Sequence, residues 1–182
     1  MKKWTAFVFA LSIALSSVVA SAANPKVGGA PMYANKNIVE NAVNSKDHTT
    51  LVAAVKAAGL VDTLEGAGPF TVFAPTNEAF AKLPQSAVED LLKPENKAAL
   101  VKVLTYHVVA GRLTAADLKK MIASGNGKAE LKTVAGGTLT ASMSGKKLVL
   151  TDEKGGTSTI TIANVMQSNG VIHVIDSVVM PN

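Results

Sequence analysis

Residues 68–80 read GPFTVFAPTNEAF, and this stretch decides the fold. The compact apolar run from Phe70 to Ala74 is typical of a buried strand. Pro75 has no backbone N–H to give to a sheet, so the strand is predicted to end there. Thr76 can then cap a short helix that places Phe80 on the core. Strand, stop, cap and helix within so few residues predict a rigid corner of the structure.

The N-terminus has the three parts of a cleavable export signal. Two lysines follow the first methionine, residues 4–19 are mainly apolar, and the small-x-small run Ala-Ser-Ala comes next. The apolar run is short for a membrane span of about 20 residues. We therefore expect a signal peptide over 1–22, cut after Ala22 or Ala23. The mature protein is then secreted or periplasmic, with no transmembrane segment left.

The length and the net charge of the mature chain limit the kinds of protein that it can be. About 160 residues remain, which suits one domain with a full core. The net charge of the whole chain is +5, and +3 is left without the two signal lysines. Basic residues are spread along the chain and aromatic residues are few, so nucleic acid is not an expected partner. The chain has no cysteine, which excludes disulfides and cysteine-ligated zinc.

The order of the predicted elements indicates an α+β domain. Capping residues and apolar faces predict helices over 38–44, 49–58, 87–92, 95–104 and 115–123. Alternation and turn signals predict strands near 106–109, 139–143, 148–150, 160–162 and 171–175. Helices first and antiparallel strands last favour α+β over a doubly wound fold. Residues 23–36 show no periodicity, so we expect a flexible lead-in before a domain over 37–182.

Three of these helices begin with a capping residue. Asn37 and Ser86 each stand three positions before a glutamate, as in a capping box. Thr114 is predicted to cap the helix that has Asp117 at its third position, where the carboxylate favours the positive end of the helix. Such side chains can satisfy the free backbone N–H groups of a first helical turn. Pro94 likewise suits the first turn of the helix that follows it.

Three blocks of the sequence resemble the homology blocks of fasciclin domains. They are residues 68–83, the Tyr-His element within 104–109, and SNGVIHVID at 168–176. Their order and spacing match that family over about 37–182. The resemblance implies a β-sandwich or wedge of mostly antiparallel strands flanked by several helices. Its motif residues in this chain are Phe70, Phe73, Pro75, Thr76, Phe80, Asn169, Gly170, His173 and Asp176.

The same resemblance implies a non-catalytic binding module for cell adhesion or for envelope and extracellular-matrix contacts. Small secreted bacterial members with one domain are the most similar. In animal matrix members, the Tyr-His element and an Asp-Ile pair are linked to integrin-dependent adhesion. The matching positions here are Tyr106 with His107, and Asn164 with Val165. The second pair lacks the carboxylate, and a neutral amide is a poor ligand for a bridging cation. The expected partner of the monomer is a cell-surface or matrix protein or polysaccharide.

The residues themselves predict no enzyme, metal site or cofactor. The spacing of His48, His107 and His173 does not favour a shared metal ion. No Gly-x-Ser-x-Gly motif is present, and the acidic pairs are sequence neighbours that do not face each other. His173 is predicted to be a core histidine with a hydrogen-bond partner. Asp176 is predicted to cap backbone amides where its strand ends.

Two other functions stay open at this point. A carrier of a small lipid or metabolite, or an unrecognised hydrolase, needs a pocket near Tyr106, His107 or His173. Such pockets have volumes of about 300 Å³ or more. A structural or stress-related envelope protein needs no discrete ligand.

Overall fold

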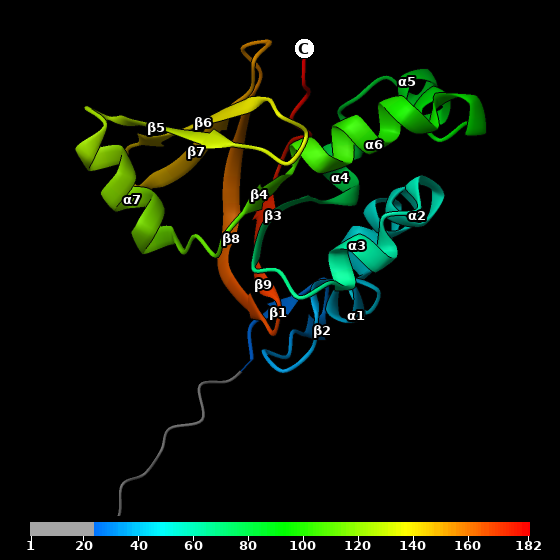
Figure 1. Cartoon of the computed structure of the whole chain (residues 1–182), viewed down its shortest axis with the longest axis horizontal. Helices are drawn as coiled ribbons and strands as arrows, with labels where there is room; N and C mark the ends of the chain where they lie inside the picture. Colours follow the sequence, from blue (N-terminus) through cyan, green and yellow to red (C-terminus); the bar gives the residue numbers. More distant parts are fainter. Residues whose placement is uncertain (1–23) are drawn as a thin grey trace, which may run out of the picture.

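A seven-stranded sheet organises the molecule (Figure 1). The computed structural model describes residues 24–182, and the predicted signal peptide over 1–22 lies outside them. The strands are β3 (Phe70–Pro75), β4 (Val108–Ala110), β5 (Lys128–Lys132), β6 (Thr138–Ser144), β7 (Lys147–Thr151), β8 (Thr157–Gln167) and β9 (Gly170–Ile175). Their order in space is β4-β3-β9-β8-β7-β6-β5. The pair β3–β9 is parallel and the other neighbours in this sheet are antiparallel, which confirms the α+β class.

The sheet curls until its two edge strands nearly meet. Val109 in β4 pairs with Thr133, just beyond β5, through an isolated antiparallel bridge. The long strand β8 has register irregularities between Ile160 and Val165. Such bulges bend a strand and increase its twist, which explains the curl. The outcome is a nearly closed barrel, and the structure does not confirm the predicted sandwich or wedge.

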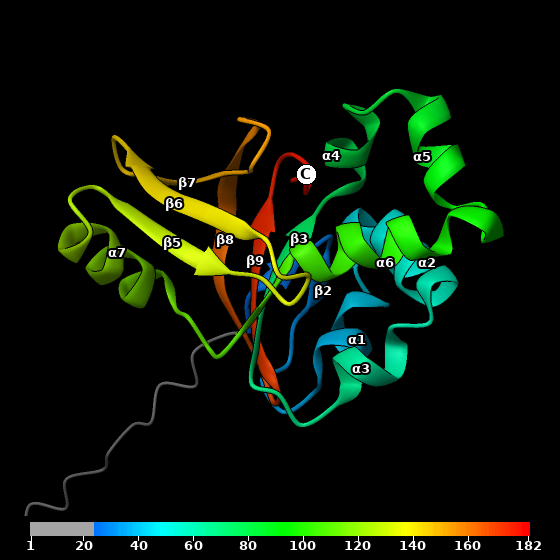
Figure 2. The same ribbon diagram turned by 45° about the horizontal axis from the view of Figure 1, so that its top comes forward.

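The helices flank this sheet on two sides (Figure 2). They are α1 (Ile38–Ala42), α2 (Thr49–Ala58), α3 (Val61–Glu65), α4 (Asn77–Ala81), α5 (Gln85–Leu91), α6 (Lys97–Tyr106) and α7 (Ala115–Ser124), with 3-10 turns at Lys46–His48 and Pro94–Asn96. Helices α1 to α6 gather on the side of β3, whereas α7 packs against β5 and β6 on the other side.

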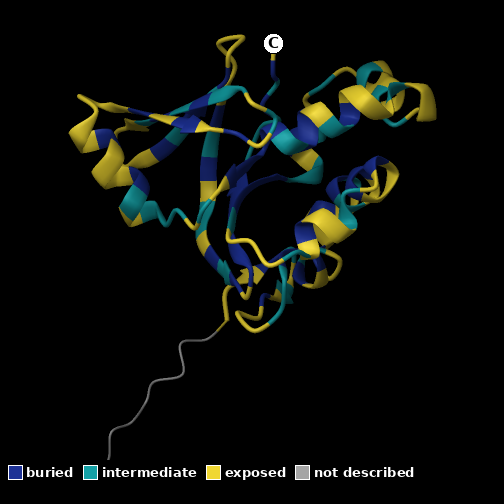
Figure 3. Cartoon of the chain, in the orientation of Figure 1, coloured by how far each residue is buried: buried dark blue, intermediate teal, exposed yellow. Residues whose placement is uncertain are grey.

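Buried side chains form two clusters, one on each face of β3 and β9. Figure 3 shows that buried residues predominate in the central strands. Val72 and Ile172 belong to the cluster under α1, α2 and α6. Phe73 and Ile175 belong to the cluster that α7 and strands β5 to β8 enclose. Every residue of β9 is buried, which confirms the prediction of a central strand.

Capping of the helices follows the sequence prediction at three sites. Asn37 and Glu40 form a reciprocal capping box at α1, and Thr114 and Asp117 form another at α7. The Thr76 hydroxyl accepts an N–H from the first turn of α4. Each of these three helices therefore starts where a side chain accepts a free N–H of the first turn.

The start of α5 differs from its prediction. The helix begins at Gln85, so the predicted Ser86–Glu89 capping box is wrong. Pro84 precedes the helix with a φ of −53°, a value that the proline ring fixes and that suits helix entry. The Glu89 carboxylate instead accepts a hydrogen bond from the Gln85 side chain.

The predicted flexible lead-in over 23–36 is wrong for the residues that the structure describes. Strands β1 (Lys26–Val27) and β2 (Ala30–Pro31) pair as an antiparallel hairpin. Val27 and Met32 are only 4% and 2% exposed and pack in the cluster under the helices. Strands of two residues are too short to show alternation, so the sequence pattern could not reveal them.

Candidate functional site

The Tyr-His element lies at the end of helix α6 and not in a strand. Tyr106 is the last residue of the helix, and His107 keeps helical backbone angles after it. The predicted extended conformation is therefore wrong, because β4 begins only at Val108. The His107 ring explains the difference. Its Nδ1–H donates to the carbonyl of Val103 at 2.8 Å and so satisfies a free carbonyl of the last helical turn.

The Tyr106 side chain is buried and tied to two neighbouring turns. Its hydroxyl donates to the carbonyl of Thr138 at 2.7 Å and accepts the N–H of Glu153 at 3.2 Å. Burial raises the pKa of the hydroxyl. Gly137 faces the ring so closely that a Cβ there would lie 2.8 Å from it. Tyr106 therefore locks α6 onto the start of β6.

The His107 ring is buried and holds the C-terminal segment. With Nδ1 donating to Val103, Nε2 is free to accept, and it takes the N–H of Val179 at 3.2 Å. Burial lowers the pKa of His107 to about 4, so the ring is neutral at physiological pH. Protonation would remove the acceptor and break the contact with the C-terminal segment.

The lowered pKa of His107 predicts a loss of stability in acid. As the pH falls from 6.5 to about 4, the unfolded chain binds this proton before the folded chain does. The free energy of unfolding is therefore highest above pH 6.5 and falls toward about pH 4, by about 3 kcal/mol for this group. Urea unfolding across this pH range measures how steeply the free energy of unfolding changes with pH. We expect a shallower slope in His107→Gln, which cannot titrate. An unchanged slope would show that another group causes the acid sensitivity.

The turn between β7 and β8 completes the attachment of the C-terminus. The Asp152 carboxylate accepts the N–H groups of Gly156 and Met180, at 2.7 and 2.9 Å. The Glu153 carboxylate accepts those of Thr138 and Asn182, and these hydrogen bonds lower its pKa. The Tyr-His element and this turn thus form one internal clasp around the last residues of the chain.

The second predicted pair, Asn164–Val165, lies in a bulge of β8. Asn164 is exposed and has a left-handed φ of 60°. Its Oδ1 accepts the N–H of Ala115 at 2.7 Å, which fixes the start of α7. The backbone N–H of Asn164 donates to His173 Nδ1 at 3.3 Å, whereas Val165 is fully buried.

His173 is a core histidine with hydrogen-bond partners, as predicted. Its Nε2 donates to the carbonyl of Leu113 at 2.8 Å, and Nδ1 accepts the N–H of Asn164. The ring stacks on Phe73 with centroids 5.7 Å apart. Burial lowers the pKa of His173, so the neutral ring joins β9 to the bulge of β8 and to the segment before α7.

The Asn169–Gly170 turn is hydrogen-bonded to α1, to the end of α3 and to the start of β3. The Asn169 side chain accepts the N–H of Ile38 and donates to the carbonyls of Leu64 and Gly66. Its own carbonyl accepts the N–H of Phe70. A Cβ on Gly170 would lie 2.1 Å from the carbonyl oxygen of Phe70, so no other residue fits without movement of the backbone.

The remaining motif residues have structural roles. Pro75 ends β3, Thr76 caps α4, and Phe80 packs against the cluster under the helices. Asp176 accepts the N–H of Thr159 at 2.8 Å, so it caps a backbone amide of β8 as predicted. Of the four predicted adhesion positions, Tyr106, His107 and Val165 are buried and Asn164 alone is exposed. The adhesion role of these four positions stays a prediction.

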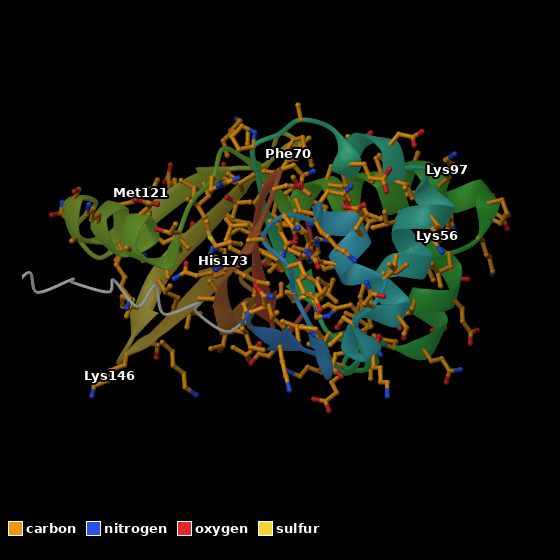
Figure 4. All side chains as sticks on the ribbon, turned by 90° about the horizontal axis from the view of Figure 1, so that it is seen from below. Lys56, Phe70, Lys97, Met121, Lys146 and His173 are labelled. Carbon is orange, nitrogen blue, oxygen red and sulfur yellow. The ribbon has the colours of Figure 1, made fainter. Side chains whose placement is uncertain are left out.

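A groove that the sequence did not predict lies at the seam of the sheet. It has a volume of about 370 Å³, and its lining residues are Val109, Ala110, Leu113, Met121, Glu130, Leu131, Lys132, Thr133 and Val134. Met121 and Val134 expose 37% and 48% of their surface here. Figure 4 shows Met121 at α7, at the opposite end of the molecule from Lys56. We name this feature the β4–β5 groove.

Unpaired strand edges border the β4–β5 groove. The edges of β4 and β5 meet only at the Val109–Thr133 bridge and at the Val134 N–H, which donates to the carbonyl of Val108 at 2.8 Å. Beyond the bridge, β5 has β6 as its one strand neighbour in the described part of the chain. A free edge of this kind can pair with an added strand. Charged residues at every second position of β5 are the one sequence signal for this edge.

Residues 24–182 give less support to a ligand-carrier pocket, a metal site or a membrane-spanning helix. An apolar cavity between the helices and β3 has a volume of about 70 Å³ and reaches His107. This is less than the 300 Å³ or so that a carrier of a drug-sized ligand requires. Within residues 24–182, no three His, Asp or Glu side chains gather as metal ligands, and no helix is long and apolar enough to span a membrane.

Comparison with known proteins agrees with this architecture. Residues 46–181 match the family described as Fasciclin domain. Protein sll1483 of Synechocystis sp. is 45% identical over 170 residues, which are 93% of this chain and 87% of that protein. Immunogenic protein MPB70 of Mycobacterium bovis is 37% identical over 145 residues, 77% of this chain and 66% of that protein.

The fold also has a counterpart among solved structures. A FAS1 domain pair from the insect cell adhesion molecule Fasciclin I aligns with a TM-score of 0.69 and 19% identity. The alignment covers 78% of this chain and 50% of that chain. From the family match and these relatives, we conclude that the chain belongs to the fasciclin domain family.

Proposed function

We propose that this protein is a secreted or periplasmic, non-catalytic binding module that attaches to a protein at a cell envelope or matrix. The β4–β5 groove carries the proposal. It combines exposed apolar side chains with a free strand edge, and an extended peptide segment binds to such a combination. Backbone hydrogen bonds to the edge would supply affinity, and apolar contacts to Met121 would supply specificity.

The relatives support the same kind of function. The solved FAS1 pair comes from a cell adhesion molecule, and this chain shares its fold. An adhesion module needs a rigid scaffold and an accessible contact surface. The clasp around the C-terminus gives rigidity, and the β4–β5 groove gives the surface.

Met121→Glu is expected to weaken binding about tenfold or more, because it places a charge in the apolar part of the groove. The measurement is the adhesion of producing cells and of host cells to immobilised protein that was purified after export. Met143→Glu is the matched control, since Met143 is 36% exposed on β6 and lies outside the groove. Circular dichroism should show both variants folded.

Two outcomes of this assay would count against the account. Equal adhesion of Met121→Glu and the natural protein would move the contact away from the β4–β5 groove. Absence of specific adhesion by the natural protein, with cells and with matrix proteins alike, would overturn the binding-module proposal. The structural envelope role would then be the better explanation.

A further inference from the structure

The lining of the apolar cavity under the helices includes a histidine with a buried ring nitrogen that is unpaired in the described part of the chain. The cavity of about 70 Å³ is bounded by α1 and α2 on one side and by β3 and α6 on the other. Its wall is formed almost wholly by hydrocarbon groups such as Val39, Val55 and Leu104. Ser45 and His48 are among its few polar lining residues, and both are buried.

Among the described residues, only one of the two ring nitrogens of His48 has a hydrogen-bond partner. Nδ1 lies 2.8 Å from the Ser45 hydroxyl and shares a hydrogen bond with it. Nε2 is buried and, among the described residues, has no hydrogen-bond partner. The ring approaches the backbone of Ala74, but no hydrogen bond of acceptable geometry forms there. Native proteins rarely leave such an atom unpaired, so its partner should come from outside the chain.

We propose that this cavity binds a small neutral alcohol, with its hydroxyl on His48 Nε2 and its hydrocarbon part against the apolar wall. A hydroxyl can either donate or accept, so it fits the ring in either tautomer. Burial keeps His48 neutral, which gives a charged head group no counter-charge at this end. The volume allows a hydrocarbon chain of only a few carbon atoms.

The cavity reaches close to the surface between α2 and α3. Lys56 and Thr63 border it there, and both residues are exposed. This is the side from which we expect a ligand to enter. The site does not depend on the proposed adhesion function. Because Val134 borders both the cavity and the β4–β5 groove, no test variant changes it.

The test is an NMR titration of the exported protein with linear primary alcohols of about three to six carbon atoms. We expect saturable shifts of the amides around Ser45 and Ala74, strongest at one chain length. The ¹⁵N resonance of His48 Nε2 should move with the same binding curve. His48→Leu should bind the same alcohols about tenfold more weakly, because the hydroxyl loses its partner.

Two substitutions of alanine by leucine distinguish binding in the cavity from binding at the surface. Ala42→Leu fills the cavity and should abolish the titration. Ala57→Leu adds the same atoms on the exposed face of α2 and should leave it unchanged. Unfolding curves confirm that each variant folds. No saturable shift for any alcohol would overturn the proposal, and a bound water would then explain His48. Equal binding by His48→Leu would also overturn it.

Discussion

Phe73→Ala is expected to lower the free energy of unfolding by about 3–5 kcal/mol. Phe73 is fully buried and stacks on His173. Removal of the ring leaves a cavity between β3 and the strands that enclose the second cluster, and the curled sheet cannot collapse into it. Urea unfolding followed by circular dichroism measures the change.

Phe73→Leu is the control for this substitution. It keeps most of the apolar volume and should cost about 1–2 kcal/mol. If the urea midpoint of Phe73→Ala equalled that of the natural protein, Phe73 would not be part of the core. A change in the slope of the unfolding curve would instead indicate an altered unfolded state.

Asn169→Ala is expected to cost about 2–4 kcal/mol of stability, less than the sum of its separate hydrogen bonds. The substitution leaves the N–H of Ile38 and the carbonyls of Leu64 and Gly66 without their partner. These groups lie in or beside α1 and α3, so both helices lose their attachment to the turn before β9. Urea unfolding measures this loss in the free energy of unfolding.

Asn44→Ala provides the matched control. Its amide also donates to a backbone carbonyl, that of Glu40, but at an exposed site where water can replace it. We expect a change of about 0.5 kcal/mol or less. If Asn169→Ala were as mild as Asn44→Ala, the Asn169 side chain would not be the link that the structure indicates.

The parts of the fold that depend on local chemistry could be predicted from the sequence. The capping boxes at Asn37 and Thr114 arise between residues three positions apart. The strand that begins at Phe70 and the central strand β9 show continuous apolar runs. The hydrogen-bonded state of His173 followed from the cost of burying an unpaired polar group.

The parts that depend on distant contacts could not be predicted. Strand β1 is stabilised by packing of Val27 in the core and not by any pattern of its own. His107 ends α6 as a helical residue because its ring reaches back to Val103 and forward to Val179. The β4–β5 groove lies where the curled sheet brings two edge strands together, and bulges in β8 contribute to that curl. No local spacing encodes that approach.

The most direct test of the account compares Met121→Glu with His107→Gln in one cell-adhesion assay, using variants that circular dichroism shows to be folded. Met121 lies in the exposed groove, whereas His107 is buried against the C-terminal segment. The account predicts that Met121→Glu loses adhesion and that His107→Gln keeps it. Loss in His107→Gln with full adhesion in Met121→Glu would contradict the account and place the contact at the Tyr-His element.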